Sequence, residues 1–176
     1  MSFPKYLVPT LILLATPFTT QAQDALPQDV GSIEAIVDAA YEAIARAPGE
    51  NYDWDRFKSL FLPQALLIPN TEQSNNEFSV LSPQGFVDWI DSVTDPSNPN
   101  DQGFAEEGYH IQIDRYGDVA NVMSSYQKHY WEQEEILGRG INSFQLVWNN
   151  DRWWIAGIAW DETYAAGSIP DVYGGE

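Results

Sequence analysis

The sequence predicts an α+β fold in which three helices pack on one face of a curved, mostly antiparallel sheet. Two patterns carry this prediction: helical spacing of apolar residues in the first half of the chain, and four strand-like segments in series after it. The last two strands are the clearest, because Asn149-Asn150-Asp151 forms a turn between two runs rich in Val, Ile, Phe and Trp. Both faces of this hairpin are apolar, so we expect the sheet to be covered on both sides.

The first helix is predicted over residues 32–47. Ser32 can cap its N-terminus, and Glu34 lies in the first turn, where the helix dipole favours an anion. Pro48-Gly49 ends the helix. Its buried stripe follows the helical period and consists of Ile33, Ile36, Val37, Ala40, Tyr41 and Ile44.

Two shorter helices are predicted on either side of an early strand. Asp53 can cap the first of them, which carries Trp54 on its apolar side and ends at Pro63. The strand follows over residues 65–68, and Ser82-Pro83 begins the third helix as N-cap and first helical position.

Four strands are expected after a loop at residues 95–103, with Tyr116-Gly117 as the turn between the first two. Pairing Arg115 with Asp118 across this turn places His110 and His129 on the outer face. The core face then holds Tyr109, Ile111, Ile113, Ala120, Val122, Ser124, Tyr126 and Tyr130. The predicted strands are approximately Ala105–Arg115, Asp118–Trp131, Gly140–Asn149 and Arg152–Asp161.

Both ends of the chain are assigned outside this domain. Residues 1–22 are typical of a secretory signal peptide, because a mostly apolar stretch precedes Thr20-Gln21-Ala22, which places small residues at the −3 and −1 positions of a cut. The apolar run is about a dozen residues, too short to span a bilayer comfortably, so we expect export to the periplasm or extracellular space without stable membrane insertion. The rest divides into a leader (23–31), the folded domain (32–163) and a flexible tail (164–176).

Composition excludes several classes of function. The chain has 26 acidic against 8 basic residues, a net charge of −18, which repels phosphate backbones and makes nucleic acid an unfavourable partner. Two histidines and no cysteine cannot form a usual structural zinc site, and the loop at 95–101 lacks the spacing of a calcium loop. There is no glycine-rich phosphate loop and no serine nucleophile elbow. The sequence therefore predicts neither a metal nor a cofactor.

Three segments resemble the nuclear transport factor 2-like superfamily, in its polyketide-cyclase-like (SnoaL-like) branch. They are residues 54–65 (WDRFKSLFLPQA), residues 116–120 (YGDVA), and the hairpin from Gln145-Leu146-Val147 through Arg152-Trp153-Trp154-Ile155. The resemblance covers roughly residues 32–163. It implies a cone-shaped fold with the three helices on the concave face of the sheet, a pocket between helices and sheet, and frequent dimers through the sheet. Because the superfamily includes isomerases, dehydratases, cyclases, hydrolases and non-catalytic binders, it assigns no reaction.

Polar residues on the predicted core face are the candidates for chemistry. Asp161 is the candidate general base, if it is enclosed, with Tyr126 as hydrogen-bond donor to a developing oxyanion. The competing interpretation is that Asp161 is a solvated residue at a strand end and that Tyr126 fills the core. We expect a ligand pocket formed with Tyr41, Trp54, Ser124, Tyr130 and Asn142, and with His110 if the register of the Tyr116-Gly117 turn is slipped by one residue.

The back of the sheet supplies a prediction about assembly. Pairing Trp148 with Trp153 places an apolar stripe there, formed by Val147, Trp154, Ile158 and Trp160. An exposed patch of this kind usually marks an interface, so we expect a two-fold homodimer packed sheet to sheet. The alternative is that the C-terminal tail covers the stripe within one chain.

Three functions follow from the sequence as alternatives. The first is an exported domain that binds a small apolar or aromatic molecule in its pocket. The second is an isomerase-, dehydratase- or cyclase-type enzyme that uses Asp161 and Tyr126. The third is a structural dimeric accessory protein with a filled core. A pocket that contains a buried carboxylate would favour the second, and an all-apolar pocket the first.

Overall fold

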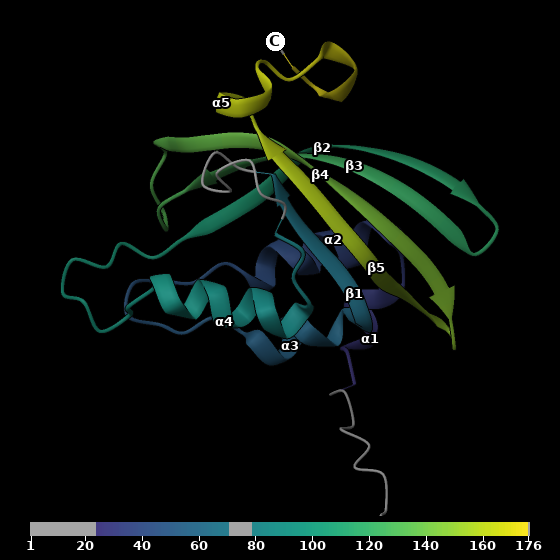
Figure 1. The fold of residues 1–176 in the computed structure, drawn as a ribbon, viewed down its shortest axis with the longest axis horizontal. Helices are drawn as coiled ribbons and strands as arrows, with labels where there is room; N and C mark the ends of the chain where they lie inside the picture. The colour runs from purple at the N-terminus through teal and green to yellow at the C-terminus, as the bar shows by residue number, and fades with distance from the viewer. Residues whose placement is uncertain (1–23, 71–78, 176) are drawn as a thin grey trace, which may run out of the picture.

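The structure is a computed structural model that describes residues 24–70 and 79–175. A five-stranded sheet in the order β1-β5-β4-β3-β2 curls around a layer of helices (Figure 1). Strand β1 runs parallel to β5, and every other neighbouring pair is antiparallel. The strands are β1 (Phe61–Asn70), β2 (Ala105–Tyr116), β3 (Val119–His129), β4 (Ile136–Asn149) and β5 (Arg152–Glu162). The helices are α1 (Pro27–Val30), α2 (Ile33–Ala43), α3 (Trp54–Ser59), α4 (Pro83–Val93), α5 (Thr163–Ala166) and the 3₁₀ turn η2 (Asp171–Tyr173).

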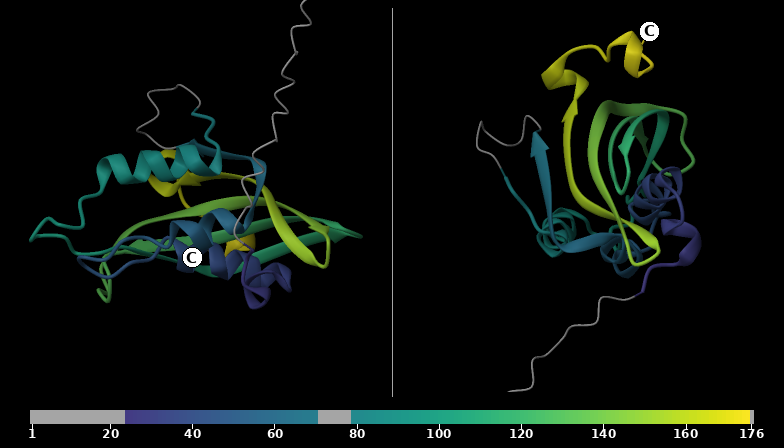
Figure 2. Two further views of the ribbon diagram at one scale, coloured as in Figure 1. Left: turned by 90° about the horizontal axis from the view of Figure 1, so that it is seen from below. Right: turned by 90° about the vertical axis from the view of Figure 1, so that its right-hand side faces the viewer.

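The three predicted helix starts are confirmed by their caps. The side chains of Ser32, Asp53 and Ser82 each accept a hydrogen bond from the backbone N–H three residues later, at 3.0–3.1 Å. Each cap satisfies one of the N–H groups that a helix leaves without an internal partner, which fixes where α2, α3 and α4 begin. All three helices lie on the face around which the sheet curls (Figure 2).

Three local assignments differ from the sequence prediction. Helix α2 ends at Ala43, before the predicted end at residue 47. The short helix α1 lies within the predicted leader, and its Asp29 is buried in an ion pair with Arg56 (Nε–Oδ2, 2.7 Å), which ties this segment to α3. Pro63 does not end α3, which stops at Ser59, but lies inside β1. Because β1 is an edge strand of the sheet, a missing N–H there is tolerated.

A β-bulge in β5 changes which residues face the helices. Ile155 pairs with Leu146 and Gly157 with Gln145, so Ala156 is an extra residue on β5. An extra residue reverses the facing of the whole strand beyond it. The core face of β5 therefore holds Trp153, Ile155, Ile158, Trp160 and Glu162.

A second bulge lies in β2. Gly108 pairs with Tyr126 and His110 with Ser125, which leaves Tyr109 unpaired. The strand keeps the predicted facing between Ile111 and the turn, but its first residues are reversed. Glu106, which strict alternation places outside, consequently points toward the helices.

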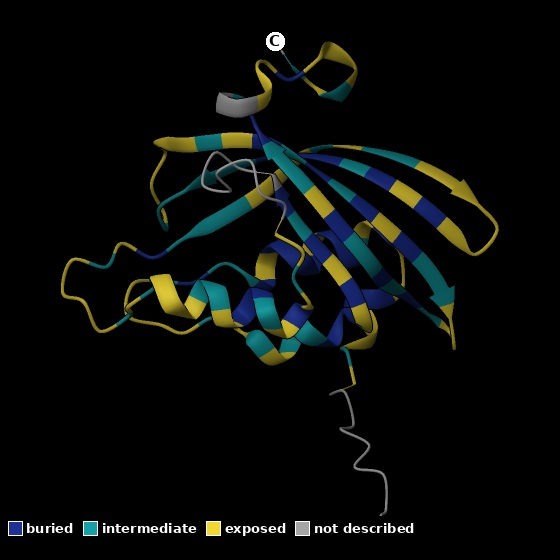
Figure 3. Cartoon of the chain, viewed as in Figure 1, coloured by how far each residue is buried: buried dark blue, intermediate teal, exposed yellow. Residues whose placement is uncertain are grey.

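The predicted apolar stripe on the back of the sheet is wrong for half of its residues. Because of the bulge at Ala156, Ile158 and Trp160 belong to the core face, and only Val147 and Trp154 remain outside. The ring of Trp154 is itself covered by the Arg152 guanidinium, 3.6 Å from the ring centroid. The strands thus show the usual alternation of buried and more exposed residues along most of their length (Figure 3).

The C-terminal tail, which the sequence assigns to a flexible segment, is folded against the outer face of the sheet. Ile169 is buried, and the backbone carbonyl of Tyr173 accepts a hydrogen bond from Ser125 Oγ at 2.7 Å. A Cβ on Gly174 would lie 2.9 Å from His110, which shows how closely the tail approaches β2.

Candidate functional site

A cavity of about 200 Å³ lies between the helices and the sheet. Aromatic side chains form most of its wall: Tyr41, Tyr52, Trp54, Phe57, Phe86, Trp89, Phe104, Phe144 and Trp160. Several of these rings contact one another edge-on around Phe86, which has Trp160 at 6.0 Å and Trp89 at 5.9 Å between ring centroids. Edge-to-face contacts are the favoured geometry of aromatic pairs, so this wall is well packed.

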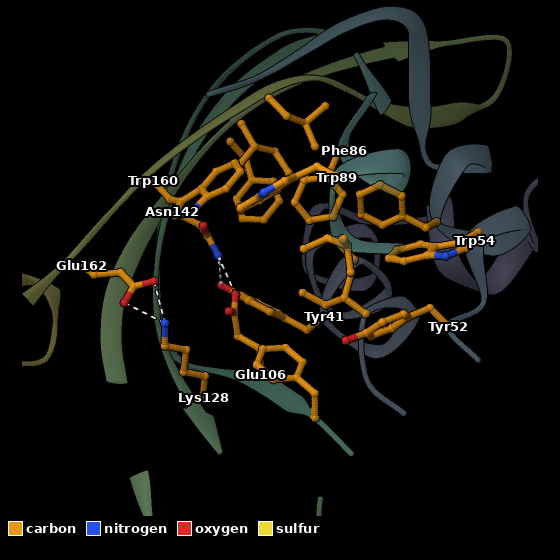
Figure 4. A pocket seen from close by; sticks show the side chains of 18 residues that line it. Tyr41, Tyr52, Trp54, Phe86, Trp89, Glu106, Lys128, Asn142, Trp160 and Glu162 are labelled. Atoms are coloured by element: carbon orange, nitrogen blue, oxygen red, sulfur yellow. Dashed lines mark hydrogen bonds and ion pairs between the residues drawn. The ribbon is translucent and has the colours of Figure 1, made fainter. Parts of the chain in front are cut away.

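The polar groups of the cavity gather at one end, on the sheet (Figure 4). Glu106 comes from β2, Lys128 from β3, Asn142 from β4 and Glu162 from β5, so four neighbouring strands each contribute one side chain. Tyr41 of α2 joins them from the helical side. The polar groups therefore form one end of an otherwise apolar cavity, which can orient a bound molecule.

The carboxyl group of Glu106 has a strongly raised pKa. Burial raises the pKa of Glu106 from 4.5 to about 7, and the nearby carboxylate of Glu162 acts in the same direction. A hydrogen bond from Asn142 and the charge of Lys128 oppose this rise without cancelling it. Part of the Glu106 side chain is still accessible, because the cavity reaches it. A carboxyl of this kind can hold or release a proton near neutral pH.

Lys128 is committed to Glu162. Its Nζ lies 2.6 and 2.7 Å from the two oxygens of that carboxylate, whose side chain is only 8% exposed. Among the described residues, the carboxyl of Glu106 therefore accepts a single hydrogen bond, from Asn142 Nδ2 at 3.2 Å. The three charged side chains together carry one negative charge whenever Glu106 is ionised.

A chain of hydrogen bonds connects Glu106 to helix α2. Asn142 Nδ2 donates to Glu106 and also to the Tyr41 hydroxyl, at 3.2 Å in both cases. The Tyr41 hydroxyl lies 2.7 Å from Ser124 Oγ. Burial raises the pKa of Tyr41 well above its usual value, so this hydroxyl stays protonated. It accepts from Asn142, and either of the two hydroxyls can donate in the bond between Tyr41 and Ser124.

The predicted pocket residues fall into two groups. Tyr41, Trp54 and Asn142 line the cavity. Ser124 is buried behind Tyr41, and Tyr130 is not part of the wall. Whether the lining residues contact a ligand stays a prediction.

The predicted placement of the two catalytic candidates is wrong. The bulge at Ala156 moves Asp161 off the cavity face and puts its neighbour Glu162 there instead. Tyr126 is 1% exposed, packed so closely that a Cβ on Gly140 would collide with its hydroxyl, and it does not line the cavity. His110 lies on the outer face beside the tail.

Sequence reasoning missed Glu106, Lys128 and Glu162. Lys128 follows the regular alternation of β3, and the two bulges that place Glu106 and Glu162 each have a signal. Gly108 and Gly157 are isolated glycines inside strands, directly beside the extra residues Tyr109 and Ala156. Such a glycine indicates a bulge or a close approach of the backbone. Here a Cβ on Gly108 would lie 2.9 Å from the Tyr41 ring, and one on Gly157 would lie 3.1 Å from the Leu66 carbonyl.

The described residues contain neither a metal-binding cluster nor a membrane-spanning helix. Within residues 24–70 and 79–175, no three His, Cys, Asp or Glu side chains are grouped so that they could hold a metal ion. None of the helices in these ranges has the length and hydropathy needed to cross a membrane.

Comparison with known proteins gives structural neighbours only. No family model and no curated protein sequence matches this chain. A nuclear transport factor 2 (NTF2)-like protein of unknown function from Pseudomonas putida KT2440 is similar over 73% of this chain and 82% of its own, with a TM-score of 0.55 and 8% identity. The hexachlorocyclohexane dehydrochlorinase LinA-type3 from Novosphingobium barchaimii LL02 is similar over 74% and 86%, with a TM-score of 0.53 and 12% identity.

A third neighbour is a protein of unknown function with a cystatin-like fold from Nostoc punctiforme PCC 73102. The similarity covers 80% of this chain and 95% of the neighbour's chain, with a TM-score of 0.53 and 14% identity. At identities this low, the likeness shows the fold and not the activity.

Proposed function

We propose that this chain, which has the NTF2-like fold, binds a small, mainly apolar molecule between its helices and its sheet. The observation that carries the proposal is the aromatic cavity closed at one end by Glu106, Asn142 and Tyr41. Ligand sites typically combine an apolar wall with a few convergent polar groups. The volume of about 200 Å³ lies below the usual range for drug-sized ligands, so the molecule is the size of one substituted six-membered ring.

Filling the cavity from α4 tests this proposal. Ile90 lines the cavity, whereas Val93, one turn further along the same helix, is 70% exposed. We expect Ile90→Trp to weaken binding of benzyl alcohol and cyclohexanol at least about tenfold, because the indole takes the place of the ligand, and Val93→Trp to leave it unchanged. Calorimetry or ligand-observed NMR measures the affinity, and urea unfolding verifies that both variants fold. Equal affinities in wild type and Ile90→Trp would contradict the proposal.

A second candidate function is acid–base catalysis, and the carboxyl of Glu106 specifically favours it. A general base works best when its pKa lies near the working pH, and burial brings Glu106 to about 7. The hydroxyl of Tyr41 could donate to a developing negative charge when Ser124 donates the hydrogen bond between the two hydroxyls. In this mechanism Glu106 is the general base, the role predicted from the sequence for Asp161.

Hydrogen exchange of a small carbon acid separates this enzyme from a simple binder. We expect the protein to accelerate deuterium uptake at the methyl group of acetophenone, with a rate that rises through pH 7 as Glu106 ionises. Glu106→Gln should abolish the acceleration, whereas Glu107→Gln, at a neighbouring side chain that is 58% exposed, should retain it. NMR follows the exchange. If the wild type exchanges the methyl protons no faster than buffer does, the catalytic function is contradicted and only the binding function remains.

Export and dimerisation also belong to the proposal. The signal-like segment lies outside the described residues, and N-terminal sequencing of the exported protein should begin at Gln23.

The homodimer stays a prediction with a narrower basis, because only Val147 and Trp154 of the predicted stripe lie on the outer face. Light scattering of the wild type and of Trp154→Glu would measure it.

A further inference from the structure

The charged side chains that line the cavity are Glu106, Lys128 and Glu162. They carry a net charge of −1 when Glu106 is ionised, and an apolar ligand does not neutralise it. Within residues 24–70 and 79–175, the carboxyl of Glu106 accepts one hydrogen bond, from the neutral amide of Asn142. Its nearest cation, Lys128, already holds both oxygens of Glu162 at 2.6 and 2.7 Å. The second carboxylate oxygen of Glu106 has no hydrogen-bond partner among the described residues, although the cavity reaches this side chain. A buried carboxylate is costly unless it is paired with a cation.

The walls of the same cavity suit a cation. Indole and phenol rings carry negative charge on their faces and attract an ammonium group that lies over them. Three tryptophans and two tyrosines line this cavity: Trp54, Trp89, Trp160, Tyr41 and Tyr52. The net charge of −18 adds a negative potential that favours the approach of cations and opposes anions.

Resting on the proposed function, we propose that the ligand is a small primary amine with an apolar ring, whose ammonium group donates to Glu106 while its ring packs against the aromatic wall. The ammonium supplies the cation that Lys128 cannot supply, because Lys128 is engaged by Glu162. The same arrangement disfavours a carboxylate ligand, since it would meet Glu106 and Glu162 while Lys128, the cation in the described lining of the cavity, is already paired.

Three probes of nearly equal shape test this inference: benzylamine, benzyl alcohol and benzoate. At pH 8 we expect benzylamine to bind at least about tenfold more tightly than benzyl alcohol, because a charge-assisted hydrogen bond is stronger than a neutral one. Benzoate should bind more weakly than both. Isothermal titration calorimetry measures the three dissociation constants.

The pH dependence should identify Glu106 as the partner. The other titratable groups that face it are Tyr41 from α2, Lys128 from β3 and Glu162 from β5. The ammonium stays charged from pH 5 to 8, as a lysine side chain does. Because Glu106 gains its proton as the pH falls through about 7, the preference for benzylamine over benzyl alcohol should shrink toward pH 5.

Glu106→Gln provides the decisive variant, because glutamine keeps the shape and the acceptor oxygen but removes the charge. It should remove the preference for benzylamine over benzyl alcohol, whereas Glu107→Gln, at an exposed side chain outside the cavity wall, should keep that preference. If benzyl alcohol binds and benzylamine binds no more tightly, the amine inference is wrong and the proposed function stands. If none of the three probes binds to the wild type, both are wrong.

Discussion

Replacing Glu106 by glutamine should stabilise the folded protein by about 3 kcal/mol above pH 7 and have no effect below pH 4. The buried carboxyl has a pKa of about 7 in the folded state, against 4.5 in the unfolded chain. A difference of this size between the two states corresponds to about 3 kcal/mol at 1.36 kcal/mol per pH unit. Glutamine removes the cost of ionising a group in this cavity.

The sign of the effect follows from which state binds the proton more tightly. Below pH 4 the Glu106 carboxyl is protonated in both the folded and the unfolded state, so its ionisation does not lower the free energy of unfolding. Between pH 4.5 and 7 the unfolded chain releases its proton while the folded protein keeps it, so the free energy of unfolding falls as the pH rises. Above pH 7 both states are ionised and the full cost is present. Urea unfolding of wild type and Glu106→Gln at several pH values measures the difference.

Glu107→Gln is the matched control for this prediction. The two glutamates are adjacent on β2, but the Glu107 side chain is 58% exposed and contacts Gln127 on the surface. Its replacement should change stability by less than about 0.5 kcal/mol at any pH, which is typical of surface substitutions. A stability difference between wild type and Glu106→Gln that is the same at pH 4 and pH 8 would show that burial of the carboxyl is not its cause.

Lys128→Met should destabilise the protein by about 3 kcal/mol at pH 8. The substitution leaves Glu162, 8% exposed, without its cation and beside the carboxyl of Glu106. Removing one partner of a buried ion pair costs about 3–5 kcal/mol, and the lower value applies because Lys128 is 24% exposed. The midpoint of urea unfolding reports the loss.

A double variant distinguishes an unpaired charge from lost packing. Lys128→Met with Glu162→Leu removes both charges and keeps apolar volume at both positions, so it should recover most of the stability that Lys128→Met loses. If the double variant is as unstable as the single one, the contribution of Lys128 is packing of its alkyl chain rather than its charge. If Lys128→Met is as stable as the wild type, the ion pair contributes nothing.

Local chemistry in the sequence determined the elements of this fold. Ser32, Asp53 and Ser82 cap their helices because a side-chain oxygen one residue before a helix satisfies an N–H that has no other partner. The strands could be located within a few residues from turn signals such as Tyr116-Gly117 and from their Val, Ile and Trp content. The layer order then followed, since apolar helix stripes must be buried against an apolar sheet face.

The facing of residues within the strands was decided only by the tertiary structure. Alternation along a strand has a period of two, so one extra residue exchanges the two faces for everything beyond it. Because of the bulge at Ala156, Glu162 rather than Asp161 lines the cavity. Because of the bulge at Tyr109, Glu106 also faces the cavity. A bulge is stabilised by pairing with neighbouring strands and by close contacts such as that of Gly108 with Tyr41, which are far apart in sequence. The sequence alone therefore determined the α+β architecture and part of the pocket wall, while the acids that give the pocket its chemistry depended on contacts that only the folded chain makes.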